Sequence, residues 1–192
     1  GLGSDSRIGT QFLQPGPGWG GSCFPKDTKA LLKIAQDNGY DFELLAGVIS
    51  ANESQFDRIA ARITTDVEAV SKTPVVAIWG LTFKSGTDDL RESPSLKIID
   101  RLISGGVAIQ AYDPTQVDSV HNSKQVKYAT SALAACEGAD LLAVFTEWEE
   151  FSSIDPKSVA SKLRNLLVFD GRNMLNKPLW VKAGFTYKGI GQ

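Results

Sequence analysis

Strands and helices alternate along the second half of the chain, and this alternation constrains the fold more than any other feature of the sequence. After Pro74, short apolar runs of strand length are followed by segments with helical apolar spacing. Such an alternation predicts a parallel sheet with right-handed crossovers. The expected strands lie at 75–81, 107–112, 140–146 and 165–170, and the expected helices at 93–104, 131–138 and 156–164.

The first 72 residues carry a different pattern. Residues 1–22 are rich in glycine and proline, which interrupt regular structure. A helix is expected from Pro25 to the Asn38–Gly39 pair, because proline is favoured at the first helical position and Asn-Gly ends helices. We therefore divide the chain into a helical segment, residues 1–72, and an α/β domain, residues 73–192.

A second, longer helix is expected over about 42–70, where apolar residues recur at three- and four-residue steps. It would be roughly 40 Å long at 1.5 Å per residue, more than a small domain needs. Part of its apolar face is therefore expected to contact a second copy of the chain, with packing inside one chain as the alternative. The residues on this face are Phe56, Ile59, Ala60, Ile63, Val67 and Val70.

Composition argues against several classes of function. The net charge is -2 and no segment carries a basic stripe, so nothing favours nucleic-acid binding. No apolar run approaches the roughly 18 residues that a membrane span needs, and the N-terminus does not resemble a signal peptide. The cysteines, Cys23 and Cys136, lie far apart, and the one histidine, His121, lies in a polar stretch. We expect neither a disulfide scaffold nor a metal site, and we expect a cytoplasmic protein.

Cys23 lies in the stretch GGSCFPKD, directly before the first expected helix. A helix N-terminus and a nearby cation, here Lys26, both favour the reactive thiolate. The preceding glycines let a ligand approach the backbone closely, where free N–H groups could bind an anion. This chemistry leaves two alternatives open, a catalytic nucleophile and a buried structural cysteine. Asp27 is either a first-turn carboxylate favoured by the helix dipole or a group that orients water beside the thiolate.

The loop 83–95 follows an expected strand and precedes an expected helix. Ligands of open α/β sheets bind at this edge, and Lys84 and Arg91 could pair with phosphates there. The loop lacks G-x-G-x-x-G, so it does not indicate a complete NAD site. Asp113 is interpreted as a turn residue before a proline.

Two further features lie at the ends of expected strands, Arg172 after the strand at 165–170 and an acidic segment at the end of the strand at 140–146. Arg172 points to the same sheet edge, with a solvent-exposed arginine as the alternative. The acidic and aromatic segment TEWEEF, residues 146–151, is expected to cap a helix and pack on the domain surface. The sequence suggests no chemical role for it.

Five stretches, in order and at similar spacing, resemble the UDP-glucose 6-dehydrogenases of the UDP-glucose/GDP-mannose dehydrogenase superfamily. They are DSRIGTQFLQPGPGWGGSCFPKD, GLTFKSGTDDLRESPS, AYDP, TEWEEF and DGRNML, and the resemblance covers essentially all 192 residues. The family oxidises the C6 alcohol of a nucleotide sugar to a carboxylate in two steps, each of which passes a hydride to NAD. The resemblance implies a helical central dimerisation segment followed by a Rossmann-like domain that binds the UDP-sugar. It also implies a fragment that lacks the N-terminal NAD-binding domain and is inactive alone.

The resemblance implies roles for individual residues. Cys23 would attack the C6 aldehyde to give a thiohemiacetal, which is oxidised to a thioester and released by water. Asp27 would assist around the cysteine and its water, and Lys26 would favour the thiolate. The other implied contacts are with substrate at Arg7, Phe12, Gly20, Lys84 and Arg172, where Arg7 reaches the substrate of a neighbouring subunit, and with NAD at Arg91.

The resemblance also implies partners and leaves alternatives. NAD would be bound mainly by the missing domain, and a homodimer would form through the helix at 42–70. Phe24 favours UDP-glucose, while UDP-N-acetylmannosamine and GDP-mannose are the alternative substrates. A non-catalytic nucleotide-sugar-binding and dimerisation module is a further alternative. A cysteine hydrolase would need a histidine base, for which His121 in its polar loop is a poor candidate.

Overall fold

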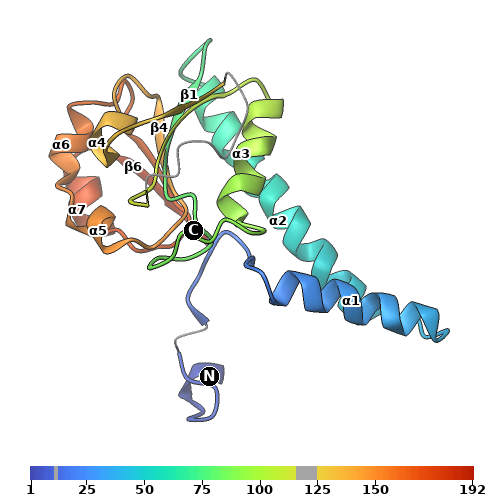
Figure 1. Cartoon of the computed structure of the whole chain (residues 1–192). Coiled ribbons are helices and arrows are strands. Elements are labelled where there is room, and N and C mark those ends of the chain that lie inside the picture. The colour runs from blue at the N-terminus through green and yellow to red at the C-terminus, as the bar shows by residue number, and fades with distance from the viewer. Residues whose placement is uncertain (11–12, 116–124) are drawn as a thin grey trace.

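The computed structural model describes residues 1–10, 13–115 and 125–192 and has an α/β architecture (Figure 1). The helical segment contains a 3-10 turn, η1 (Leu2–Ser4), and two α-helices, α1 (Phe24–Asp37) and α2 (Glu43–Glu68). The later described elements are β1 (Val75–Trp79), α3 (Pro94–Ser104), β2 (Ala108–Tyr112), β3 (Val126–Tyr128), α4 (Ala132–Ala135), β4 (Leu141–Val144), α5 (Glu149–Ser153), α6 (Pro156–Ala160), β5 (Leu167–Asp170), α7 (Lys177–Lys182) and β6 (Thr186–Gly189). They include all the predicted strands and helices and add β3, α5, α7 and β6, so that strand follows strand at β2-β3 and helix follows helix at α5-α6.

The described strands form one parallel sheet in the order β3-β2-β1-β4-β5-β6. β1 pairs with β2 on one side and with β4 on the other, so that Val76 lies opposite Ile109 and Leu141. The chain order reverses between these neighbours, and ligands of open α/β sheets bind at the carboxyl ends of strands at such a switch point. The predicted Rossmann-like parallel sheet is confirmed.

The strands predicted from the sequence are present, but the sequence makes two of them too long at their carboxyl ends. The strand predicted at 75–81 ends at Trp79, and the strand predicted at 140–146 ends at Val144. Leu81 and Phe145 are as buried as the strand residues before them. Apolar side chains therefore continue past the last ladder pair, into the loops that carry the site.

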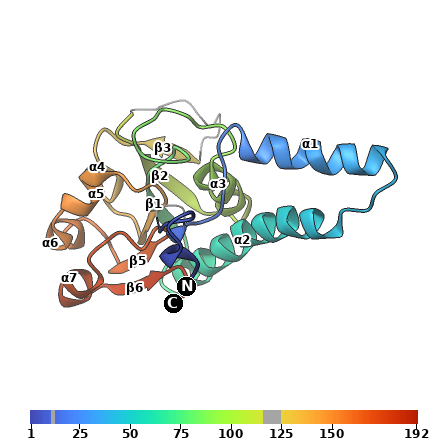
Figure 2. The same cartoon turned by 90° about the horizontal axis from the view of Figure 1, so that it is seen from below.

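Alternating side chains along β1 fill two cores, one on each face of the sheet. Val76 and Ile78 belong to the core beneath α2 and α3, whereas Ala77 and Trp79 belong to the core beneath α4 to α7. Figures 1 and 2 show these two groups of helices on opposite faces. Cys136 lies fully buried in the second core and packs there as a small apolar residue.

The long helix α2 begins and ends close to the predicted positions 42 and 70. Most of its predicted apolar face is buried, but the prediction that Val70 belongs to this helical face is wrong, because Val70 lies beyond the C-cap residue Ala69. Asn52 and the residues of α2 before it are not buried. The buried residues of α2 are Phe56, Ile59, Ala60, Ile63 and Val67.

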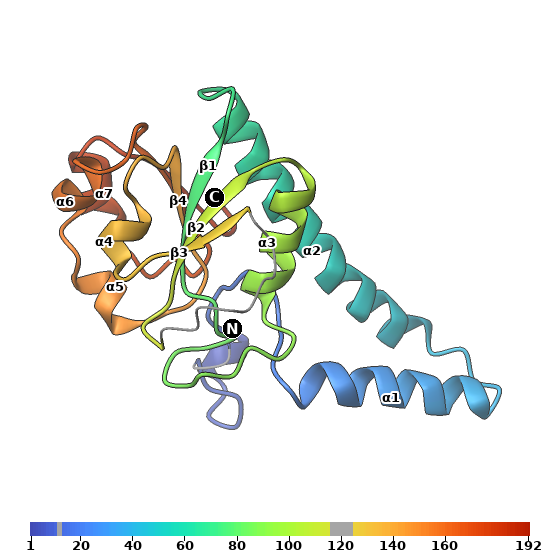
Figure 3. The ribbon, with the colours of Figure 1, turned by 45° about the horizontal axis from the view of Figure 1, so that its top comes forward.

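Helix α1 and the first half of α2, residues 24–55, form an arm that projects from the sheet and its covering helices (Figure 3). Pro25 is the only buried residue of the arm. Large apolar side chains are exposed along it, and such patches mark interaction surfaces. They include Leu31, Ile34, Leu44 and Val48. None of the described helices combines the length and apolarity needed to cross a lipid bilayer.

Candidate active site

A glycine-rich loop, residues 16–22, leads into α1 and is held from one side by Asn52 of α2. The Trp19 N–H donates to Asn52 Oδ1 at 2.9 Å, and Asn52 Nδ2 donates to the Trp19 carbonyl at 3.2 Å. Gly18 has a φ of +144°, and an added Cβ would lie 2.8 Å from Asn52 Oδ1. Glycine therefore allows the loop to lie directly on the helix.

The opposite side of this loop is held by the backbone of residues 91 and 92. The Gly21 N–H donates to the Arg91 carbonyl at 3.1 Å. A Cβ added to Gly20 would lie 2.2 Å from the Glu92 carbonyl oxygen, so only glycine fits there. The loop before Cys23 is thus fixed between α2 and the segment that precedes α3.

Cys23 is the N-cap residue of α1, and its side chain is exposed. Its Sγ lies 3.6 Å from Ser22 Oγ. This placement excludes the alternative of a buried structural cysteine. Cys136 is the buried thiol, and burial raises its pKa to about 12, opposed in part by its contact with Trp79.

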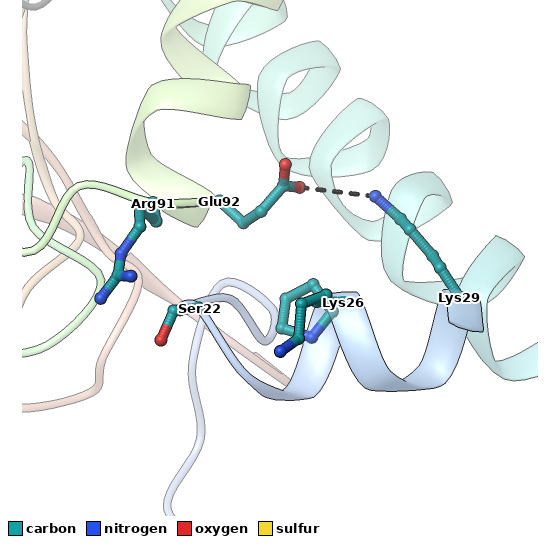
Figure 4. Close-up of a pocket in the computed structure, with 7 residues that line it drawn as sticks. Ser22, Lys26, Lys29, Arg91 and Glu92 are labelled. Carbon is teal, nitrogen blue, oxygen red and sulfur yellow. Dashed lines mark ion pairs between the residues drawn. The ribbon is translucent and has the colours of Figure 1, made fainter. Parts of the chain in front are cut away.

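A pocket of about 520 Å³ opens at the start of α1, where Ser22, the neighbour of Cys23 in the chain, lines it while Cys23 itself does not (Figure 4). Glu92 points toward Lys29, with 3.7 Å between carboxylate and ammonium, while Arg91 extends in the other direction. Lys26 forms an exposed ion pair with Asp27 at 3.4 Å. Three of the lining side chains are cations, and each also pairs with a carboxylate: Lys26 with Asp27, Lys29 with Glu92, and Arg91 with Asp89. The lining residues are Gly21, Ser22, Pro25, Lys26, Lys29, Arg91 and Glu92.

Arg91 is oriented by Asp89. The Arg91 backbone N–H and Nε donate to Asp89 Oδ1 at 3.0 and 2.9 Å, and Nη2 donates to Oδ2 at 2.7 Å. These bonds lower the pKa of Asp89 to about 2. They also raise the pKa of Arg91, with a smaller contribution from the Cys23 sulfur. The guanidinium that lines the pocket is therefore charged and fixed.

Arg172 forms a second group at the carboxyl edge of the sheet. Its Nε donates to the Phe145 carbonyl at 2.8 Å, and Nη2 donates to the Phe83 carbonyl at 3.0 Å. Its side chain is 17% exposed, which excludes the alternative of a solvent-exposed arginine. Burial lowers the pKa of Arg172, and the neighbouring Glu147 opposes this shift. A Cβ added to Gly16 would lie 2.9 Å from Nη1, so the glycine-rich loop contacts this group too.

Phe83 joins the two groups. Its carbonyl accepts from Arg172, and its ring lies 3.0 to 3.3 Å from a Cβ added to Gly21. The neighbouring Lys84 is exposed, with Nζ 5.5 Å from the centroid of the same ring. The structure thus brings Cys23 and Arg172 to opposite ends of one glycine-rich loop.

Arg7, a predicted substrate contact, does not lie in either of these groups. Arg7 is exposed in the N-terminal turn and pairs with Asp5, with 2.7 Å between Nη2 and Oδ2. No described residue outside that turn contacts the Arg7 guanidinium through a hydrogen bond or ion pair. Phe12 lies outside the described residues.

Three residues that contact the loops of the site were not predicted from the sequence to have a chemical role. Asn52 and Glu147 contact it from distant parts of the chain. Asp113, interpreted as a turn residue, does accept from Thr115 through Oδ1, but its Oδ2 also accepts from the Leu81 N–H at 2.7 Å. Of these three residues, Glu147 lies in a segment that the sequence marks as unusual, the acidic and aromatic TEWEEF. The sequence did not indicate what that segment contacts.

The described residues do not form a complete dinucleotide site. The letters G-x-G-x-x-G do occur at residues 16–21, but a dinucleotide fingerprint must follow a strand, and no strand is described before β1. The turn after β1 is instead the long loop 80–93. The described residues also bring together no group of three or more His, Cys, Asp or Glu side chains that could hold a metal ion.

The two thiols are expected to differ in reactivity. In the native chain at pH 8, an aromatic disulfide reagent should modify Cys23 at least about 100-fold faster than Cys136, because only the first is exposed. Release of the coloured thiolate measures the rate of modification. Unfolding in guanidinium should raise the number of rapidly reacting thiols to two. Two rapidly reacting thiols in the native chain would contradict the placement of Cys136.

Comparisons with known proteins cover the whole chain. The sequence model of the UDP-glucose/GDP-mannose dehydrogenase family, UDP binding domain, matches residues 77–177, and that of the family's central domain matches residues 1–54. UDP-glucose 6-dehydrogenase from Pseudomonas aeruginosa is 40% identical over 199 residues, which cover all of this chain and 44% of that protein. A UDP-glucose 6-dehydrogenase from Bacillus subtilis is 40% identical over all of this chain and 42% of its own length. The chain therefore spans less than half the length of these relatives.

Solved structures give the same result. A UDP-glucose dehydrogenase from Pyrobaculum islandicum superposes with a TM-score of 0.80 at 27% identity, over 98% of this chain and 41% of that one. A UDP-D-ManNAc dehydrogenase from Pyrococcus horikoshii superposes with a TM-score of 0.78 at 31% identity, over 99% of this chain and 42% of that one. With matched sequence models and shared architecture, the chain belongs to the UDP-glucose/GDP-mannose dehydrogenase family.

Proposed function

We propose that the chain carries the nucleophile and the nucleotide-sugar site of an NAD-dependent UDP-glucose 6-dehydrogenase, which converts UDP-glucose to UDP-glucuronate. The observation that carries this proposal is the exposed Cys23 at the start of α1, where a pocket with three ion-paired cations opens. The UDP-glucose enzymes among the relatives support the choice of sugar. Residues 1–72 would serve as the central dimerisation segment and residues 73–192 as the UDP-binding domain.

In this proposal Cys23 acts on the half-oxidised sugar. The thiolate adds to the C6 aldehyde, and the oxygen takes up a proton to give a thiohemiacetal. That carbon then loses a hydride and its hydroxyl loses a proton, which leaves a thioester on Cys23. Water cleaves the thioester to the acid and the free thiol, with Asp27 assisting the water and Lys26 favouring the thiolate. NAD, when bound, accepts the hydride in each of the two oxidations.

The remaining site residues would bind and orient. Lys84 and Arg172 would contact the nucleotide at the sheet edge, and Gly20 would allow the sugar to approach the loop. Arg91 would contact NAD, which a second domain would mainly hold. Arg7 would reach the site of a neighbouring subunit, and Phe12 would contact the substrate.

Two measurements on the 192-residue chain test this function. Isothermal titration calorimetry with UDP should show binding, because Lys84 and Arg172 are present. Incubation with UDP-glucose and NAD should give no NADH, since the dinucleotide site is incomplete. Turnover at rates typical of enzymes would refute the proposal that a second domain is needed to hold NAD. Absence of UDP binding would refute the proposed nucleotide site. UDP binding by an inactive full-length protein would favour the non-catalytic module.

UDP-N-acetylmannosamine is the second candidate substrate, because the Pyrococcus horikoshii structure is also similar. Comparing kcat/KM of the full-length protein for the two sugars decides between them. We expect UDP-glucose to be preferred. A cytoplasmic location is also part of the proposal and is supported by the two free thiols.

The exposed apolar side chains of the arm support a homodimer. Leu44 is 76% exposed and Val48 lies one helical turn further on. The chain should therefore sediment at twice its 20.7 kDa mass, and Leu44→Glu should give the monomer. Val181→Glu on α7 introduces the same charge at an exposed apolar position far from the arm, and it should leave the dimer intact. A monomeric unmodified chain would contradict this proposal.

A further inference from the structure

Glu147, in the TEWEEF segment after β4, lies between the two residues proposed to contact the nucleotide. Its Oε1 accepts from the Ser85 N–H at 3.2 Å, directly after Lys84 in the chain. Its Oε2 lies 3.0 Å from Arg172 Nε. The single Nε hydrogen donates to the Phe145 carbonyl, so the contact with Glu147 is an ion pair without a hydrogen bond. One carboxylate thus contacts Arg172 directly and the Lys84 loop through Ser85.

The neighbours of Glu147 hold the same loop. Thr146 Oγ1 donates to the Thr82 carbonyl at 2.6 Å. Trp148 Nε1 donates to Asp113 Oδ2 at 3.3 Å, and that oxygen also accepts from the Thr82 N–H. Three consecutive residues therefore fasten the beginning of the loop that carries Lys84.

Arg172 needs a nearby negative charge because its guanidinium is largely removed from water. Burial of a cation disfavours the charged form unless an opposite charge compensates. Backbone carbonyls accept from Nε and Nη2 but carry no full charge. Glu147 is the carboxylate paired with Arg172 among the described residues. Without it, the guanidinium would gain by turning toward solvent.

We propose that Glu147 is a positioning residue that orients Arg172 and the Lys84 loop toward the diphosphate of a nucleotide sugar. The inference rests on the proposed function, since it assumes that these two residues bind the nucleotide. A positioning role and a purely electrostatic role of Glu147 predict opposite changes in the affinity for UDP when its charge is removed. A carboxylate repels a diphosphate, so neutralising Glu147 should tighten binding if its charge alone matters.

The test compares Glu147→Gln with Glu149→Gln in the 192-residue chain. Both variants remove one negative charge from the same segment, but Glu149 is exposed and no described residue contacts its carboxylate through a hydrogen bond or ion pair. UDP titrated by calorimetry should bind about tenfold more weakly to Glu147→Gln, whereas the dissociation constant for Glu149→Gln should stay within about twofold of wild type. Unchanged or tighter binding to Glu147→Gln would overturn the proposal.

Amide hydrogen exchange tests the same proposal without a ligand. Peptides covering residues 83–88 should exchange at least about fivefold faster in Glu147→Ala, because Ser85 loses its acceptor. Peptides from β1 should exchange as in wild type, which separates local release from general destabilisation. Unchanged exchange at 83–88 would show that Glu147 does not hold the loop. If wild type binds no UDP, the proposed function fails, and the exchange result still decides whether Glu147 positions the loop.

Discussion

Replacement of Cys23 by serine in the full-length protein is expected to slow formation of the sugar acid by about 10⁴-fold. A serine hydroxyl is not ionised near neutral pH and adds poorly to an aldehyde, so no covalent intermediate forms. Cys23 is exposed at the start of α1, so the substitution removes no contact of the buried core. NADH absorbance and product analysis measure both oxidations.

The control for this result is Cys136→Ala. Cys136 is fully buried in the core under α4, away from the pocket at the start of α1, so this variant should retain activity while losing some stability. Acid formation by Cys23→Ser within about tenfold of wild type would contradict the covalent route. Loss of activity in both variants would point to the fold instead.

Replacement of Trp79 by alanine is expected to lower the free energy of unfolding by about 3–5 kcal/mol. Trp79 is completely buried, its ring stacks on Phe151 at 5.1 Å, and its Nε1 donates to the Ala132 carbonyl at 2.8 Å. The substitution leaves a cavity between β1 and two helices and an unpaired buried carbonyl. Guanidinium unfolding followed by circular dichroism measures the change.

Leu179→Ala on α7 is the matched control, because Leu179 is apolar and 53% exposed. Its free energy of unfolding should stay within about 0.5 kcal/mol of wild type. A loss below about 1 kcal/mol for Trp79→Ala would show that the second core tolerates the cavity.

The central strands β1, β4 and β5 were predictable because they are buried on both faces and read as continuous apolar runs, whereas β2 alternates buried and half-buried residues. The edge strands β3 and β6 were not predictable, since VKY and TYKG are short, partly polar and paired on one side only. Ser93 shows that a residue's place in a helix does not reveal the partner of its side chain. It is the N-cap residue of α3, yet its hydroxyl donates to the Leu81 carbonyl, which only the folded loop brings near.

The parts of the candidate site that could be predicted are those whose reactive or charged residues lie close together in the sequence. Cys23, Lys26 and Arg91 belong to two recognisable stretches, and the structure brings both stretches to one pocket. Asn52 and Glu147 could not be found in this way. Each contacts a residue more than thirty positions away, and one amide or carboxylate in a helix or loop gives no sequence signal of such a contact.

The contact between Gly21 and Arg91 has a consequence for the order of events during synthesis. The cysteine leaves the ribosome well before the carbonyl that anchors its loop. A nascent chain that ends before residue 91 therefore carries the thiol on a loop that is not yet anchored. The pocket at the start of α1 can form only after the loop that follows β1 has been synthesised.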